Sequence, residues 1–374
     1  MIRTVEYKLR PNKRQETLLQ SFLDGSRQVY NAALQELIDH FQQTGKYLPY
    51  FTQDKTHGKA RWPDLPAVVV DTTLQRLHRS YKFFFEGHKA GKKVGRPRFK
   101  SYRSWSSFEF RDGTQRVEDD VFKGGRQLGN IKLVQPDRPV PGKFQRARIV
   151  KRPSGWYVQC ITELPDDVLP ATDKAVGLDV GLLYLVTDSD GNHTENPHNL
   201  KSGLKKLRRL QRRVARRTKG SNRRRKAVRT LARHHERLSN RRKDHLHKVS
   251  RHYVNENGVI VVEDLNIKGL VRNHCFAQAI TDASWGMLVG MLAYKAEGAG
   301  RELIRVNPAY TSQRCSSCGE MVQKSLSTRT HRCPFCGYTD CRDINAAKNI
   351  LAAGLSLRPG QGLQELSDAT ATFS

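Results

Sequence analysis

The stretch AVGLDVGLLYLV, residues 175–186, together with GVIVVEDL, residues 258–265, decides the fold class of the C-terminal half. Both are short apolar runs rich in Val and Leu, which is typical of strands buried inside a sheet. We expect 175–186 to form one strand that a turn at 188–191 connects to a second strand. A helix over 282–299 and a further strand in RELIRV, residues 301–306, then complete an α/β pattern.

Acidic side chains occur at three points of this pattern. Asp179 lies inside GLDVG, Glu263 ends VIVVE, and Asp343 is placed to cap a helix over 343–353. A carboxylate in an apolar strand is costly unless it coordinates a cation or pairs. If the three converge, two Mg²⁺ or Mn²⁺ ions about 3.5–4 Å apart could position a water and stabilise the leaving 3′ oxygen of a phosphodiester. An edge-strand charge, a salt-bridge partner and a plain helix cap remain the alternatives.

The sequence contains seven cysteines, and four of them form two CxxC pairs, Cys315 with Cys318 and Cys333 with Cys336. The 14 residues between the pairs are typical of a tetrahedral Zn²⁺ site, and Gly319 and Gly337 permit a tight turn after each pair. Because four sulfur ligands leave no position for water, this zinc is expected to be structural. We expect Cys160 and Cys275 to be buried thiols, and Cys341 to lie outside the zinc site.

The positive charge is concentrated in one segment. The formal net charge of the 374 residues is +30, and residues 201–250 hold 21 Lys or Arg against two acids. Helical spacing of Leu and Val, interrupted at Gly220-Ser221, predicts a helical hairpin with broad basic faces, which favours nucleic-acid contact. A solvated basic arm is the alternative. The candidate contacts are Lys205, Arg208, Arg209, Arg212, Arg213, Arg216, Arg223, Arg224 and Arg225.

A second basic segment, GKKVGRPRFKSYRSWSSFEF, spans residues 91–110. Its cations could neutralise phosphates while Phe99, Tyr102 and Trp105 stack on bases. Ordinary packing at an exposed strand edge is the alternative. The candidate contacts here are Lys92, Lys93, Arg96, Arg98, Lys100 and Arg103.

The N-terminal half reads as β-structure with inserted helices. Residues 1–10 alternate like a strand, and helical periodicity follows over 18–41 and again over 74–85, with a loop between these helices. We expect the aromatic residues of the second helix to belong to the core. Short alternating runs between 105 and 165 predict strands that an antiparallel barrel would close, and 165–173 resembles a linker.

From the sequence we expect neither a membrane-spanning protein nor a secreted scaffold held by disulfides. The longest apolar stretch, Trp285 to Tyr294, is too short to cross a bilayer, and MIRTVEYKLR lacks the apolar region of a signal peptide. A charge this positive favours a polyanion partner, of which nucleic acid is the commonest. We therefore expect no membrane partner.

Several motifs together resemble one known family. GLDVG, VVEDLN, NPAYTSQRCSSCG and RCPFCGYTDCRDINAAKNIL, with YKLRPNKRQETLL, VYNAAL and GRPRF nearer the N-terminus, are similar to TnpB. TnpB proteins are RNA-guided endonucleases encoded by insertion sequences and related to the small type V CRISPR effectors. The resemblance extends from Met1 to about Gly354. The family usually has DRD before the NAA helix, where this chain has Cys341-Arg342-Asp343; the last Asp is kept, so metal binding is expected to survive.

The resemblance implies a multidomain α+β fold and a mechanism. Its parts would be a wedge-like antiparallel β-barrel (1–10 and 96–170), a helical recognition lobe (11–95), an RNase H-like RuvC nuclease core (171–311 and 339–354), a Cys₄ zinc-ribbon insert (312–338) and a flexible tail (355–374). It places the catalytic, metal-binding trio on Asp179, Glu263 and Asp343. Arg342 and Asn345 could contact the scissile phosphate or lie on the solvated surface.

The implied partners are a guide RNA from the right end of the element and double-stranded DNA beside a short adjacent motif. The protein would act as a monomer in a ribonucleoprotein, in the prokaryotic cytoplasm and associated with the nucleoid. A type V CRISPR effector is a near neighbour that the chain's small size and short helical lobe disfavour. A strand-transferring transposase and a non-catalytic zinc- and RNA-binding protein are the alternative functions.

Overall fold

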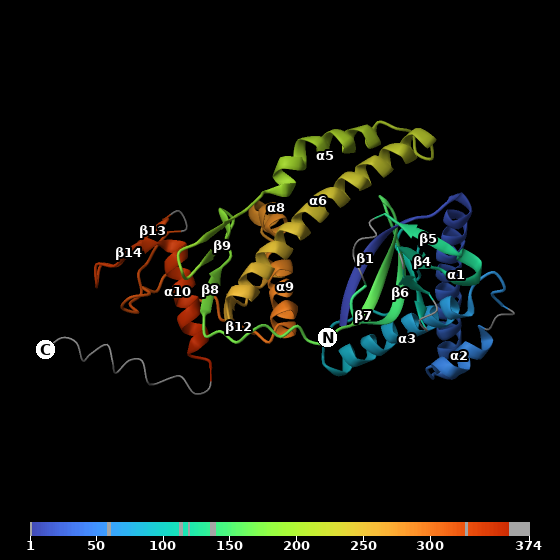
Figure 1. The fold of residues 1–374 in the computed structure, drawn as a ribbon, viewed down its shortest axis with the longest axis horizontal. Helices are drawn as coiled ribbons and strands as arrows, with labels where there is room; N and C mark the ends of the chain where they lie inside the picture. Colours follow the sequence, from blue (N-terminus) through green and yellow to red (C-terminus); the bar gives the residue numbers. More distant parts are fainter. Residues whose placement is uncertain are drawn as a thin grey trace. The chain divides into compact units, whose positions relative to one another are not determined.

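The computed structural model describes residues 2–57, 61–111, 115–118, 120–134, 140–325 and 328–358. The chain divides into two compact units between Pro165 and Asp166 (Figure 1). This division falls in the predicted linker, while the finer domain boundaries stay predictions. Most of the predicted C-terminal tail lies outside the described residues.

The N-terminal unit contains an antiparallel sheet of seven strands in the order β2-β6-β7-β1-β5-β4-β3. The strands are β1 (Ile2–Arg10), β2 (Ser107–Arg111), β3 (Arg116–Glu118), β4 (Val121–Lys123), β5 (Asn130–Leu133), β6 (Lys143–Arg152) and β7 (Gly155–Glu163). Trp156, Val158 and Cys160 alternate inward along β7, so the buried position predicted for Cys160 is confirmed. Within the described ranges no ladder joins β2 to β3, and barrel closure stays a prediction.

Helices pack against this sheet to form one apolar core. They are α1 (Lys13–Thr44), α2 (Tyr50–Thr56), α3 (Ala67–Lys89) and the short α4 (Gly125–Leu128). A capping box fixes the start of α1, since the side chains of Asn12 and Gln15 each accept the other's backbone N–H. The prediction of a loop before Leu65 was incomplete, because this segment contains α2. The aromatic residues of α3 are not all core: Phe83 is 66% exposed and Phe85 41%.

The C-terminal unit contains a mixed sheet in the order β10-β9-β8-β11-β12. Its strands are β8 (Ala175–Asp179), β9 (Tyr184–Asp188), β10 (His193–Glu195), β11 (Val259–Glu263) and β12 (Glu302–Val306). β8, β11 and β12 are parallel, whereas β9 and β10 are antiparallel to their neighbours. The single strand predicted over 175–186 is wrong, because the chain reverses between Asp179 and Tyr184. The apolar run continues through the turn because Leu182 also packs against the core.

Helices cover both faces of this sheet (Figure 1). The helices of this unit are α5 (Asn199–Ala215), α6 (Asn222–Glu256), α7 (Ile267–Leu270), α8 (His274–Ala283), α9 (Trp285–Gly298) and α10 (Arg342–Leu355), of which α6, α9 and α10 form the two covering layers. Ile260 and Val262 of β11 face α6 and α9, while Val259 and Val261 face α10. The alternation of side chains along a strand therefore produces three layers.

The predicted helical hairpin of 201–250 is confirmed as α5 and α6, and Ser221 caps α6 by accepting the Arg224 N–H (3.1 Å). The helix predicted over 282–299 is confirmed as α9 except at its start, where Ser284 adopts a left-handed conformation (φ +57°) that separates α9 from α8. A small two-stranded sheet, β13 (Thr330–Arg332) with β14 (Thr339–Cys341), precedes α10. In the part of the chain that is described, no helix has the length and apolar character to span a bilayer.

Candidate active site and cysteine cluster

Two of the predicted carboxylates end neighbouring parallel strands. In the β8–β11 ladder Leu178 pairs with Val262, so Asp179 and Glu263 follow at the same edge of the sheet. Each is the last residue of its strand, and each is partly buried. Ligand sites of open α/β sheets form at the carboxyl ends of parallel strands. The sheet therefore presents two acids where a site is expected.

Helix α10 brings the third carboxylate to the same sheet. A Cβ added to Gly177 would lie 2.2 Å from the carbonyl oxygen of Ala347, so only glycine allows α10 this close to β8. Asp343 lies one turn before Ala347 on the same helix face. It occupies the first turn of α10, and Cys341 is the N-cap residue. The prediction that Asp343 caps the helix is therefore wrong, because the helix begins directly after β14.

The electrostatics show that these acids interact. Burial raises the pKa of Asp179 to about 8, and the charges of Glu263 and Asp343 act in the same direction, while Arg342 lowers it. Burial also raises the pKa of Glu263, whose Oε1 accepts the hydroxyl of Thr311 (2.6 Å). The carboxylate oxygens of the three acids do not all lie within 4.8 Å of one another. Among the described residues, only the ligand atoms of the four cysteines lie that close together. They form an open group of repelling hard oxygen donors, which suits divalent cations.

The raised pKa predicts how metal-free stability depends on pH. The folded protein holds the Asp179 proton up to about pH 8, whereas the ordinary pKa is 3.8. The unfolded chain therefore binds fewer protons between these values, so stability is lost as the pH rises from about 4 to about 8. In Mg²⁺-free buffer we expect the melting temperature of the wild type to fall, relative to that of Asp179→Asn, from pH 5 to pH 8. A difference between the two proteins that is constant with pH would contradict this prediction.

Arginines balance the charge of Asp343. Arg342 donates from Nε (3.0 Å) and Nη2 (2.9 Å) to Asp343 Oδ1, and Arg329 lies 3.8 Å from Oδ2. Asn345 is fully buried, so neither role considered for it, phosphate contact or solvated surface, is correct. It accepts the N–H of Ser316 (2.9 Å) and donates to the carbonyl of Arg314 (2.7 Å). Asn345 thus ties α10 to the first cysteine pair, a role without a signal in the sequence.

The four paired cysteines form a compact cluster. Their sulfurs all lie within 4.8 Å of one another, with Cys315 Sγ 3.8 Å from Cys336 Sγ and Cys318 Sγ 3.5 Å from Cys333 Sγ. Sulfurs held about 2.3 Å from a tetrahedral zinc ion would be about 3.8 Å apart. Both pairs turn in the same way, through Gly319 (φ +80°) and Gly337 (φ +74°). The cluster can therefore hold a zinc ion, and Cys341 lies outside it.

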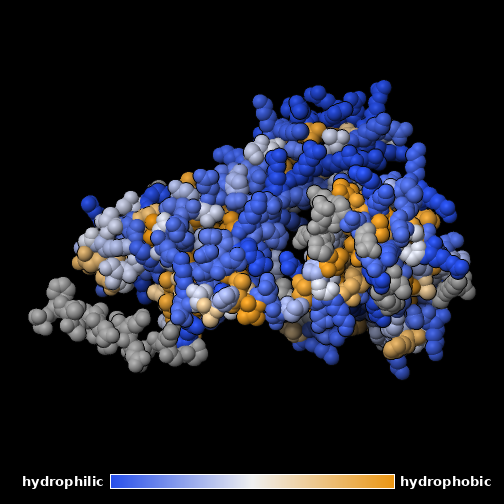
Figure 2. Space-filling view, in the orientation of Figure 1, coloured by the Kyte–Doolittle hydropathy of each residue, from blue (hydrophilic) through white to orange (hydrophobic). Residues whose placement is uncertain are grey.

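The candidate nucleic-acid contacts occupy solvated positions with few exceptions. On α5 and α6 all are exposed except Arg224, which is partly exposed, and Figure 2 shows mainly hydrophilic side chains over this hairpin. In residues 91–106, Phe99 (52%) and Tyr102 (67%) are exposed. Trp105 is buried and donates to Ser26 Oγ (2.8 Å), so it is unavailable for stacking. The buried position predicted for Cys275 is also wrong, because this thiol is exposed.

Three family models match this chain. The OrfB_IS605 model, described as "Probable transposase", matches residues 159–274, which include Asp179 and Glu263. The model described as "Cas12f1-like, TNB domain" matches 285–350, which include the cysteine cluster and Asp343. A model described as a helix-turn-helix domain matches 1–46, where the structure has β1 and the single helix α1.

Curated relatives cover nearly the whole chain. A Streptomyces pristinaespiralis protein named "Putative RNA-guided DNA endonuclease" is 32% identical over 99% of this chain and 94% of its own. The Escherichia coli protein "Putative RNA-guided DNA endonuclease InsQ" is 31% identical over 94% of this chain and 92% of its own. The chain belongs to the TnpB family. TnpB proteins are related to the CRISPR effectors: the Sulfoacidibacillus thermotolerans "CRISPR-associated endodeoxyribonuclease Cas12f1" is 28% identical over 57% of this chain and 55% of its own.

Proposed function

We propose that this chain is an RNA-guided endonuclease that cuts double-stranded DNA beside a short flanking motif. The observation that carries the proposal is the convergence of Asp179, Glu263 and Asp343 on one edge of the sheet in a TnpB family member. The curated relatives that span this chain are named RNA-guided DNA endonucleases, which supports the same activity. We propose an RNase H-like, RuvC-type core for the C-terminal unit, because its mixed sheet carries α10 over β8 and β11.

The carboxylates have the chemistry of a two-metal site. Two bound Mg²⁺ or Mn²⁺ ions would supply an activated water and stabilise the leaving 3′ oxygen. Asp179 is the residue most able to contact both ions, because the charges of both other acids act on it. The hydroxyl of Thr311 holds the carboxylate of Glu263 in one orientation. Arg342, beside Asp343, places a cation where a phosphate would enter.

The cysteine cluster has a structural function in this proposal. Four thiolates saturate a tetrahedral Zn²⁺ and leave no position for water or substrate. The insert contributes few buried apolar residues of its own, mainly Val322 and the cysteines Cys315 and Cys333. Zinc would therefore supply most of the stability of the insert.

The basic hairpin of α5 and α6 is proposed to hold nucleic acid by its phosphates. Its exposed arginines point away from the thin apolar stripe of Leu207, Leu210 and Leu238. Such contacts bind without reading sequence, so base pairing to a guide RNA would provide the choice of target. The protein itself would read only the short flanking duplex motif.

Copurification with cellular RNA tests the proposed partner. We expect one abundant RNA species with a variable 3′ end to be protected, because a guide has a constant scaffold and a variable target segment. RNA that merely follows cellular abundance would contradict an RNA-guided function. Incubating the purified complex with matching DNA should then give cut products, whereas joined products dependent on transposon ends would favour a transposase.

A further inference from the structure

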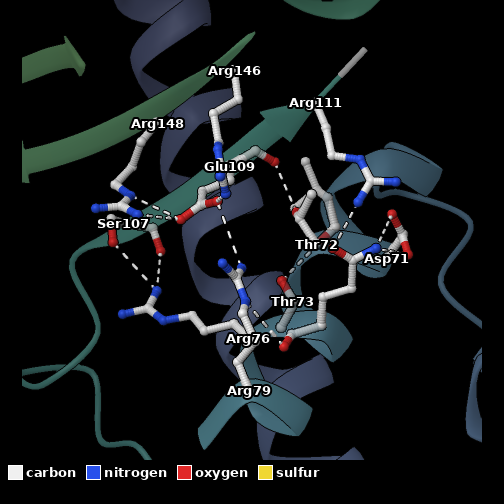
Figure 3. Close-up of polar contacts among 12 residues, drawn as sticks. Asp71, Thr72, Thr73, Arg76, Arg79, Ser107, Glu109, Arg111, Arg146 and Arg148 are labelled. Atoms are coloured by element: carbon white, nitrogen blue, oxygen red, sulfur yellow. Dashed lines mark hydrogen bonds and ion pairs between the residues drawn. The ribbon is translucent and has the colours of Figure 1, made fainter. Parts of the chain in front are cut away.

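A group of arginines surrounds one buried carboxylate in the N-terminal unit (Figure 3). Glu109 of β2, only 7% exposed, lies opposite Arg148 of β6 in the strand ladder. Arg79 approaches Glu109 from α3 and Arg146 approaches it from β6, while Arg76 of α3 lies beside them and donates to the carbonyl (3.3 Å) and hydroxyl (3.4 Å) of Ser107. We call Arg76, Arg79, Arg146 and Arg148 the arginine cluster. It brings four cations around a single anion.

Only one arginine of the cluster, Arg148, lies within hydrogen-bond distance of Glu109. Arg148 donates to Glu109 Oε1 from both Nε (2.8 Å) and Nη2 (2.7 Å). Arg146 and Arg79 lie 3.7 and 4.0 Å from Oε2, beyond hydrogen-bond distance. Burial lowers the pKa of Arg76, and the nearby charges of Arg148 and Arg79 lower it further, while Glu109 raises it. The cluster therefore carries an excess of positive charge that a second anion would balance.

The cluster opens into a cavity. Arg76, Arg79, Arg148 and Glu109 line a space of about 490 Å³, together with Ser80 and Phe83 of α3. This volume is within the range of small-ligand sites. Val94, Gly95 and Pro97 form another wall, so the cavity is continuous with the basic segment 91–106. Arg79 also lines a neighbouring space of about 340 Å³ with Arg111 and Arg146.

We propose that the arginine cluster binds a backbone phosphate of a nucleic acid, and that Glu109 is a positioning residue that orients the guanidinium groups. Planar guanidinium groups suit phosphate oxygens because they donate two parallel hydrogen bonds. Phe83, 66% exposed at the cavity, supplies a ring on which a neighbouring base can stack. The basic residues Lys92, Lys93, Arg96 and Arg98 beside the cavity favour a polymer over a free phosphate ion. The proposal rests on the proposed function only in naming nucleic acid as the source of the phosphate.

Thermal shifts with inorganic pyrophosphate test the anion site directly, at matched ionic strength and on the full chain. Arg148→Gln and Arg79→Gln should lose at least about half of the wild-type shift, since ligand stabilisation falls with affinity. Arg116→Gln is the matched control, because Arg116 pairs with Glu118 on β3 (2.9 Å) and its loss changes the charge equally. Glu109→Gln should melt lower without ligand and show a smaller shift, because Arg148 loses the carboxylate that orients its guanidinium group. Full shifts in both cluster variants would overturn the proposal; Arg79, 53% exposed, can be replaced without unfolding the chain.

Binding of short single-stranded RNA and DNA of one sequence identifies the source of the phosphate. We expect Arg148→Gln to weaken binding about fivefold at roughly 0.1 M salt and to reduce the salt slope by about 0.7, the effect of one lost phosphate contact. A loss with RNA, with DNA or with both supports the proposal and names the polymer. Unchanged affinity and slope with both would overturn it. If the protein shows no guided DNA cleavage but pyrophosphate still raises its melting temperature, the proposed function is contradicted and the proposed phosphate site is not.

Discussion

Replacing Asp179 by Ala is expected to abolish DNA cleavage and to leave RNA binding intact. Asp179 ends β8, and the charges of both Glu263 and Asp343 raise its pKa. Removing it deletes the carboxylate that both cations would share, so cleavage should fall by ~10³-fold or more. The measurement is cleavage of matching DNA by the copurified ribonucleoprotein, with the bound RNA quantified in the same sample.

Asp190→Ala is the matched control for this experiment. Asp190 lies in the turn after β9 of the same unit, is 41% exposed and pairs with Lys174 at 3.4 Å. The two variants change the net charge equally. A loss of cleavage that occurs in Asp179→Ala and not in Asp190→Ala therefore reports on the candidate active site. Removing a repelled, buried carboxylate should not destabilise the fold, which separates lost chemistry from unfolding. Cleavage within about tenfold of the wild type would contradict the assigned role.

Removing zinc should have the second large effect. In Cys315→Ser/Cys333→Ser we expect the bound zinc to disappear and the insert 312–338 to become sensitive to protease. Structural zinc contributes about 10–16 kcal/mol in isolated zinc-finger peptides, far more than this insert's small apolar cluster can replace. Cleavage should fall at least tenfold, because Asp343 lies in the first turn of the helix that follows the insert.

Cys275→Ser controls for the loss of a thiol, because Cys275 is exposed and lies outside the cluster. Metal analysis of the purified proteins should find zinc in this variant and in the wild type. Zinc retained in the double cysteine variant, or an insert still resistant to protease, would rule out the cluster as the zinc site.

Much of the fold could be predicted because it depends on local patterns. Neighbouring residues in the sequence determine the CxxC spacing, the apolar strand at 259–263 and the basic hairpin. The structure contains each of these features. The structure also places Asp179 where the charges of Glu263 and Asp343 raise its pKa, while the catalytic role of the three acids stays a prediction. The turn at 180–183 could not be predicted, because Leu182 keeps the apolar pattern unbroken. The break at Ser284 gave no signal either, since serine rarely adopts a left-handed conformation.

Features that depend on pairing between distant segments of the chain could not be predicted from the sequence. In SFEFR the alternation of Phe and charged residues predicts a strand, but only the β2–β6 register places Glu109 opposite Arg148. Trp105 sits in a basic, aromatic stretch that is typical of nucleic-acid binding, yet its indole packs inward and bonds Ser26. Sequence spacing gives the composition of a surface, and tertiary contacts decide which of its members are available.

The asparagines of α10 connect the cysteine cluster to the residue that bonds Glu263. Asn345 bonds the backbone on both sides of Cys315, and Asn349 donates to the carbonyls of Thr311 (2.8 Å) and Arg314 (2.7 Å). Thr311 in turn bonds Glu263. A newly synthesised chain that has not yet captured zinc would thus lack the anchor for two of its three acids. Nuclease activity would therefore depend on the zinc available to the newly made chain.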